Sequence, residues 1–212
     1  MMRYEKELAY LVQWCDEHHI ACQDAHLHAL DAYLALLWRY QTRTNLVGSR
    51  SVAEIVSDLC IDSLQILRTG PLQGTCIDVG SGAGFPAIVL KIFAPEQAFH
   101  LIEPRTKRYA FLQLVVRELD LKNIVVHNQK IENLTFDRID FAISKAFAPL
   151  PDWIRLAAPW AEQGAQIACL VSVKDWTAHY DELVKNYRIL GSIEEASRVY
   201  ARIEKRRSLS EG

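Results

Sequence analysis

The spacing of apolar positions changes along the chain, and from residue 75 onward short apolar runs alternate with helically spaced segments. Alternation of this kind is typical of an α/β fold, in which a parallel sheet carries helices on both faces. The apolar runs predict strands at 75–79, 98–103, 123–128, 139–143 and 165–172, and the segments between them predict helices at 85–94, 106–119, 148–160 and 175–185. The runs at 187–193 and 198–203 predict a final antiparallel pair of strands.

Residues 3–69 have apolar side chains at helical spacing, with a third helix predicted over 51–68. The segment Thr69-Gly70-Pro71 is then typical of a short linker. We therefore expect an N-terminal helical extension, residues 1–70, that packs on a main domain of residues 71–204. Residues 205–212 are expected to form a flexible tail.

A glycine-rich turn follows the first predicted strand. Gly80, Gly82 and Gly84 stand at alternate positions between the strand and a helix, and glycine allows a sharp turn with no side chain to block a ligand. Turns at this place in open α/β sheets bind nucleotides. A dinucleotide fingerprint needs a third glycine where Phe85 stands, whereas G-x-G-x-G is the pattern expected for S-adenosylmethionine.

Glu103 closes the second predicted strand, about 20 residues beyond the glycines, where a carboxylate takes the ribose hydroxyls of an adenosine. The alternative is that Glu103 caps the next helix. No G-x-x-x-x-G-K-[ST] segment is present, which argues against a P-loop nucleotidase.

Composition narrows the class of protein. The 212 residues are 50% hydrophobic and carry a net charge of −2, so any RNA binding must use local basic patches. Five cysteines without paired spacing, a start unlike a signal peptide and no long apolar run predict a soluble cytoplasmic protein. Cysteines and histidines crowd between Cys15 and His28, but on one helix they would spread over roughly 16 Å, so we expect no metal site.

Several motifs in order resemble one known family. The stretches are Val79-Gly-Ser-Gly-Ala-Gly-Phe-Pro86, Asn45-Leu46, Ile61-Asp62-Ser63-Leu64, Lys107-Arg108 with Phe111-Leu112, Ile131-Glu132 and Ser144-Lys145-Ala146-Phe147-Ala148. Together with the helical extension, they are similar to the RsmG/GidB family of bacterial 16S rRNA guanine-N7 methyltransferases. The resemblance covers about residues 44–150.

The resemblance implies a Rossmann-like class I methyltransferase that binds S-adenosylmethionine and methylates a guanine of small-subunit rRNA. It places the cofactor along the glycine turn, at Gly80, Ser81, Gly82, Gly84 and Phe85. Ile131 and Glu132 would hold the adenosine end, and Asp78 would orient the turn or the methionine end. Lys145 stands where the family has an arginine near cofactor and substrate, and is the expected catalytic residue.

The chain departs from the family at three positions. Lys145 replaces a fork-shaped guanidinium with a point charge, Leu59 stands where a histidine is usual, and Val171 where a lysine is usual. These departures lie on the substrate side. The sequence therefore leaves open a same-fold methyltransferase for another RNA or small molecule, or a non-catalytic module that binds rRNA or a ribosome-assembly partner.

The chemistry needs no general base, because guanine N7 offers a free lone pair. The enzyme's task is then mainly alignment of donor and acceptor. Cys169 lies in an apolar run and is expected to be a buried thiol, not a nucleophile. The expected partner is 16S rRNA or a small ribosomal particle, bound by a protein that we expect to be a monomer. Candidate RNA contacts are Arg39, Arg43, Arg50, Arg105, Lys107, Arg108, Lys145 and Lys174, with Phe147 or Trp153 as stacking rings.

Overall fold

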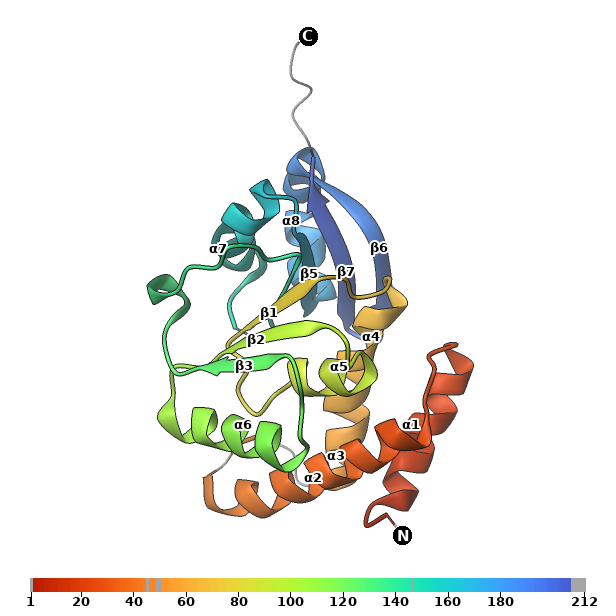
Figure 1. The fold of residues 1–212 in the computed structure, drawn as a ribbon. Helices are drawn as coiled ribbons and strands as arrows, with labels where there is room; N and C mark the ends of the chain where they lie inside the picture. Colours follow the sequence, from red (N-terminus) through yellow and green to blue (C-terminus); the bar gives the residue numbers. More distant parts are fainter. Residues whose placement is uncertain (1, 45, 49–50, 146, 207–212) are drawn as a thin grey trace.

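The computed structural model describes residues 2–44, 46–48, 51–145 and 147–206. Its centre is one sheet with the strand order β3-β2-β1-β4-β5-β7-β6 (Figure 1). The strands are β1 (Thr75–Val79), β2 (Ala98–Ile102), β3 (Ile124–His127), β4 (Phe141–Ile143), β5 (Gln166–Ser172), β6 (Tyr187–Glu195) and β7 (Arg198–Lys205).

The strand directions confirm the predicted α/β class. β3, β2, β1, β4 and β5 are mutually parallel, whereas β7 pairs antiparallel with both β5 and β6. β1 is buried along nearly its whole length, as expected for a strand covered on both faces. The order reverses at β1, so its carboxyl end is the switch point at which ligands bind in such sheets.

Helices cover both faces of this sheet (Figure 1). The helices are α1 (Glu5–Glu17), α2 (Asp24–Thr44), α3 (Val52–Ile55), α4 (Ile61–Arg68), α5 (Ala87–Phe93), α6 (Thr106–Glu118), α7 (Leu150–Glu162) and α8 (Val173–Asn186). Apolar residues of α1–α6 share one cluster with Phe99 and Phe141 of the sheet. α7 and α8 contribute to a second cluster, with Ile77 and Ile167.

The predicted third helix is interrupted. Between α3 and α4 the chain makes a π-helical turn, Val56–Cys60, which we call the π turn. Such turns insert one extra residue into a helix and are frequent at functional sites. Here the π turn ends just before Asp62, a carboxylate that is only 8% exposed.

Several predicted boundaries shift by one or two residues, and for two of them the contacts give a reason. Lys205, expected in the tail, ends β7, and its ammonium lies 2.9 Å from a carboxylate oxygen of Glu162. The last helix begins at Val173, earlier than expected, because the Ser172 hydroxyl accepts a hydrogen bond from the Asp175 amide and caps it. Residues 207–212 of the predicted tail lie outside the described residues.

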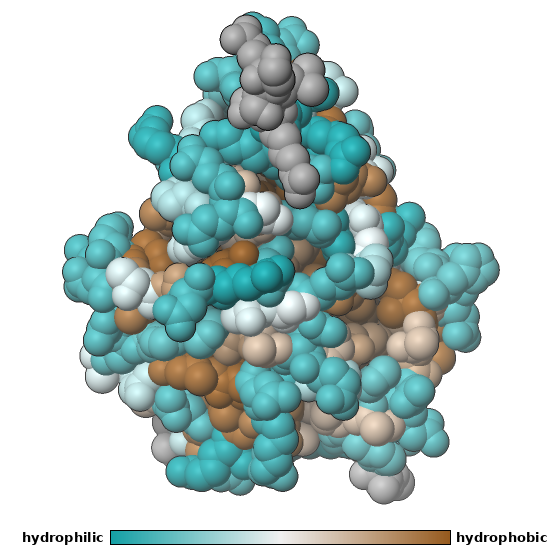
Figure 2. Space-filling view, turned by 45° about the horizontal axis from the view of Figure 1, so that its top comes forward, coloured by the Kyte–Doolittle hydropathy of each residue, from teal (hydrophilic) through white to brown (hydrophobic). Residues whose placement is uncertain are grey.

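The surface is mixed in character. On the face shown in Figure 2, hydrophobic side chains form separate patches bordered by hydrophilic ones. Within the described ranges, no helix is both long and apolar enough to cross a membrane. Nor do the described histidines, cysteines and acids include a group of three or more that could hold a metal ion.

Candidate active site

The turn that follows β1 has a backbone conformation that requires glycine at three positions. The φ angles of Gly80, Gly82 and Gly84 are 78°, 59° and 106°, values that other residues rarely adopt. A Cβ on Gly80 would lie 2.7 Å from Phe147, and one on Gly84 would lie 2.5 Å from Ile88. A Cβ on Gly82 would meet nothing closer than Arg108, at 3.7 Å. A Cβ on the middle glycine would therefore make only ordinary van der Waals contacts, whereas the outer two glycines are constrained by packing.

A hollow of about 520 Å³ opens beside this turn, and we call it the glycine pocket. It brings together five of the predicted site residues, Gly80, Ser81, Gly82, Phe85 and Lys145. Its remaining lining residues are Leu46, Val47, Gly48, Glu54, Asp58, Leu59, Ala83, Arg108 and Arg198. The predicted residues Asp78, Gly84, Glu103, Ile131 and Glu132 do not belong to its lining.

Glu103 braces the turn from the neighbouring strand. Its carboxylate is 3% exposed and accepts hydrogen bonds from the Gly82 amide, at 3.0 Å, and from the Arg105 amide, at 2.8 Å. The second bond satisfies a donor at the start of α6, as the capping alternative expected. The hydrogen bond from the Gly82 amide ties this pocket-lining residue to the end of β2. Glu103's role toward a ribose stays a prediction.

Asp78 is a buried carboxyl group under the turn. Neither of its carboxyl oxygens has a hydrogen-bond partner among the described residues, and burial raises the pKa of Asp78 to about 7. Its backbone carbonyl accepts a hydrogen bond from the Ser81 hydroxyl at 3.0 Å. The main chain of Asp78 thus holds the turn, while its carboxyl group is fully buried near the Ser81 hydroxyl and the Ala87 amide, which oppose the rise in its pKa.

The turn is also supported from the N-terminal helices, a contact that the sequence did not reveal. Tyr33 of α2 is fully buried and donates a hydrogen bond from its hydroxyl to the Ala83 carbonyl at 2.8 Å. Its ring packs against Phe85, with 5.5 Å between ring centroids. The only sequence signal at Tyr33 is its place on the apolar face of the second helix.

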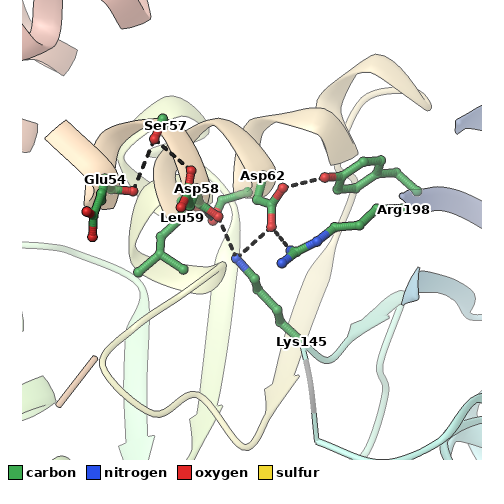
Figure 3. Close-up of polar contacts among 9 residues, drawn as sticks. Glu54, Ser57, Asp58, Leu59, Asp62, Lys145 and Arg198 are labelled. Carbon is green, nitrogen blue, oxygen red and sulfur yellow. Dashed lines mark hydrogen bonds and ion pairs between the residues drawn. The ribbon is translucent and has the colours of Figure 1, made fainter. Parts of the chain in front are cut away.

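Lys145 also lines the pocket, within a network centred on Asp62 (Figure 3). Its ammonium is 3.0 Å from a carboxylate oxygen of Asp62 and 3.3 Å from the Asp58 carbonyl oxygen. Burial lowers the pKa of Lys145, and the Asp62 charge opposes that effect. Asp62 also accepts hydrogen bonds from Arg198 and from the Tyr200 hydroxyl.

Asp62 belongs to the motif Ile61-Asp62-Ser63, which the sequence flagged without assigning a role. Arg198 was missed, because it lies 136 residues from Asp62 in the sequence and only the β5–β7 pairing brings it to the pocket. The predicted catalytic Lys145 is therefore part of a buried ion-pair cluster at the pocket wall.

Ile131 and Glu132 lie in a 3₁₀ turn after β3. Ile131 is 7% exposed and packs in the apolar cluster on the α7 side of the sheet, whereas Glu132 is exposed. Their role in holding an adenosine stays a prediction.

The structure separates the candidate stacking rings. Phe147 is 47% exposed and lies beside Gly80. Trp153 is 3% exposed, and its indole nitrogen donates to the Ala168 carbonyl at 2.9 Å. The prediction that Trp153 could stack on a base is therefore wrong, because its ring is part of the core.

The candidate basic contacts are spread over several elements. Arg108 lines the glycine pocket, Arg105 and Lys107 are exposed at the start of α6, and Lys174 is exposed on α8. Arg50 and the Arg43 side chain lie outside the described part of the chain.

Cys169 is fully buried, which confirms the expected buried thiol, and burial raises its pKa to about 12.

Comparisons with known proteins identify the family and the fold. Residues 26–206 match the family model described as rRNA small subunit methyltransferase G. A protein of that name from Wolinella succinogenes is 36% identical over 178 residues, covering 84% of each chain.

Solved structures are similar in fold at low sequence identity. A ribosomal protein L11 methylase from Lactobacillus delbrueckii subsp. bulgaricus aligns with a TM-score of 0.59 and 12% identity, covering 69% of this chain and 77% of that one. M. jannaschii TYW2, solved in complex with AdoMet, aligns with a TM-score of 0.52 and 15% identity, covering 67% and 75%.

Proposed function

Because the chain belongs to the rRNA small subunit methyltransferase G family, we propose that it transfers the methyl group of S-adenosylmethionine to N7 of a guanine in 16S rRNA. The observation that carries the proposal is the glycine pocket, which is lined by the glycine turn and by both basic side chains (Arg108, Lys145 and Arg198) and acidic ones (Glu54 and Asp58). The substrate is 16S rRNA or a small ribosomal particle, and we place the enzyme in the cytoplasm as a monomer.

The residues present fit this cofactor. At Gly82 no side chain occupies the pocket, so a ligand can approach the main chain of the turn. Gly80, Ser81, Gly82, Gly84 and Phe85 would hold its methionine end. Glu103, Ile131 and Glu132 would hold its adenosine end, Asp78 would orient the turn, and Lys145 would contact the cofactor. S-adenosylmethionine supplies an electrophilic methyl group carried on a sulfonium.

The chain's own groups suit alignment better than proton transfer. Guanine N7 has a free lone pair, so no proton has to be removed before attack. The Lys145 ammonium is held by Asp62 and the Asp58 carbonyl, and a protonated amine in such a place can donate but cannot act as a base. The pocket would therefore act mainly by positioning the base.

Transfer of labelled methyl groups from S-adenosylmethionine to 16S rRNA, free or in small subunits, tests the proposal. We expect one methylated guanine per rRNA, mapped at N7 by chemical cleavage of the labelled RNA. Label at another atom or in another RNA would support a different substrate of the same fold. Cofactor binding without any label transfer would indicate a non-catalytic module.

A further inference from the structure

A second hollow adjoins the glycine pocket, and we call it the side hollow. Its volume is about 320 Å³, and it lies between α1, the π turn with α4, and the turn from β6 to β7. Tyr10 and Trp14 of α1 form one wall, and Gln65 of α4 forms part of another. Asp58 and Arg198 line both hollows. The two hollows are therefore adjacent and share these two residues as a boundary.

The two cations near this boundary differ in how far the protein already uses them. The Lys145 side chain is 11% exposed, and its ammonium has two partners inside the protein. The Arg198 side chain is 47% exposed. Among the described residues, its one hydrogen-bonded nitrogen is Nη1, which donates to Asp62. Since a guanidinium carries five N–H donors in a fixed fork, Arg198 is the cation that can still bind a phosphate.

Asp62 fixes the direction of that guanidinium. Asp62 is 8% exposed. Its carboxylate forms ion pairs with Arg198 and Lys145 and accepts a hydrogen bond from the Tyr200 hydroxyl. Figure 3 shows Arg198 and Lys145 approaching Asp62 from different elements. Asp62 is therefore a positioning residue, and it acts on a substrate only through the two cations.

Of the acids that line the side hollow, Glu195 and Asp62 are paired with cations of the protein, whereas Asp58 accepts from a hydroxyl, which does not neutralise a carboxylate. Glu195 lies 2.8 Å from Arg68, Asp58 accepts a hydrogen bond from the Ser57 hydroxyl at 2.7 Å, and Asp62 holds its two cations. Their remaining acceptor capacity suits the N–H donors on the edge of a base. The phosphate would stay at the boundary, on Arg198.

The side hollow also offers an aromatic surface. The Tyr10 side chain is 55% exposed although it is large and mostly apolar. Exposed rings of this kind stack on unpaired bases, which is the common mode of single-stranded RNA recognition.

We propose that the side hollow is a second nucleotide subsite, which takes the rRNA base next to the target guanine. In this arrangement the neighbouring base stacks on Tyr10, and the phosphate that joins it to the target binds Arg198. The proposal rests on the function proposed above, since it assumes that the target base enters the glycine pocket.

The test compares Tyr10→Ala, Arg198→Gln and Arg198→Lys with wild type. KM and kcat are measured with 16S rRNA, and the dissociation constant is measured at several salt concentrations. We expect Tyr10→Ala to raise KM about tenfold with little change in kcat, because one stacking contact is lost. Arg198→Gln should lower the slope of log affinity against log salt by about 0.7, the value for one phosphate contact on a single strand. Arg198→Lys should restore that slope, because it keeps the charge.

Matched controls come from similar side chains away from both hollows. Tyr180 of α8 is 41% exposed, and Arg188 of β6 is paired with Glu204; Tyr180→Ala and Arg188→Gln should leave KM and the salt slope unchanged. S-adenosylmethionine affinity and thermal melting should stay near wild type in Tyr10→Ala, because the Tyr10 ring is exposed. If Tyr10→Ala and Arg198→Gln both retain wild-type KM and salt slope while wild type methylates rRNA, the subsite is refuted and the proposed function stands. If wild type does not methylate rRNA, the proposed function itself fails.

Discussion

Replacing Asp62 by asparagine tests the ion-pair cluster at the pocket wall. The Asp62 and Lys145 side chains are each 11% exposed, with 3.0 Å between their charged atoms. Removing one partner of a buried pair typically costs 3–5 kcal/mol, because the other charge stays buried without compensation. Lys145 keeps the Asp58 carbonyl, and asparagine can still accept hydrogen bonds, so we expect a loss of about 3 kcal/mol.

The assay is urea denaturation of the ligand-free protein, run as a double-mutant cycle with Lys145→Met. Lys145→Met alone should cost less, because Asp62 keeps Arg198 and Tyr200. The double variant should lose less stability than the two single losses added together, by at least about 1 kcal/mol, since the uncompensated ammonium is gone. Asp152→Asn is the matched control: its pair with Arg155 is also 3.0 Å long but more than half exposed on both sides, so it should cost at most about 1 kcal/mol. Strictly additive losses, or equal effects at Asp62 and Asp152, would refute the reasoning.

Three further outcomes follow from the same geometry. Burial raises the pKa of Asp78 to about 7, so the folded protein holds that proton more tightly than the unfolded chain and loses stability as the pH rises from about 4 to about 7, by at most about 4 kcal/mol. Asp78→Asn should therefore match wild type near pH 4 and exceed it at pH 8 in urea denaturation, and parallel pH curves would contradict this. Phe147→Ala should lower rRNA methylation without lowering the melting temperature, because its ring is 47% exposed beside the turn; unchanged kinetics would remove it from the site. Lys145→Ala should reduce methyl transfer more than it reduces stability, and activity equal to wild type would remove Lys145 from the site.

The sequence predicted the sheet and the glycine turn at the carboxyl end of β1 well, because local patterns determine both. The runs that became β1 and β2 are short and mostly apolar, interrupted by Asp78 and His100, and three glycines at alternate positions favour a tight turn. The carboxylate of Glu103 was also placed correctly at the end of a strand. The partners of this carboxylate were less predictable. A carboxylate at this position can accept hydrogen bonds from the Gly82 and Arg105 amides or from a ribose, and the sequence does not distinguish between them.

Features that depend on distant contacts were not predictable. Tyr33 supports the turn from 50 residues away, and Arg198 reaches Asp62 only after the last strands pair with β5. Trp153 shows the opposite error: an aromatic residue near the predicted site edge could be interpreted as a stacking ring until its indole was found bonded to Ala168 in the core. Periodicity shows which positions are apolar, but it does not show which distant partner each one meets.

Calorimetric titration of S-adenosylmethionine into wild type, Gly82→Val and Gly164→Val tests the central claim most directly. Both glycines have positive φ, and a Cβ on either would meet no atom closer than 3.7 Å, but only Gly82 faces the glycine pocket. The two variants therefore share the backbone strain of about 1–3 kcal/mol and differ in whether the new side chain fills the pocket. The account predicts one-to-one binding by wild type and Gly164→Val and none by Gly82→Val. Equal binding by all three proteins, or no binding by wild type, would contradict it.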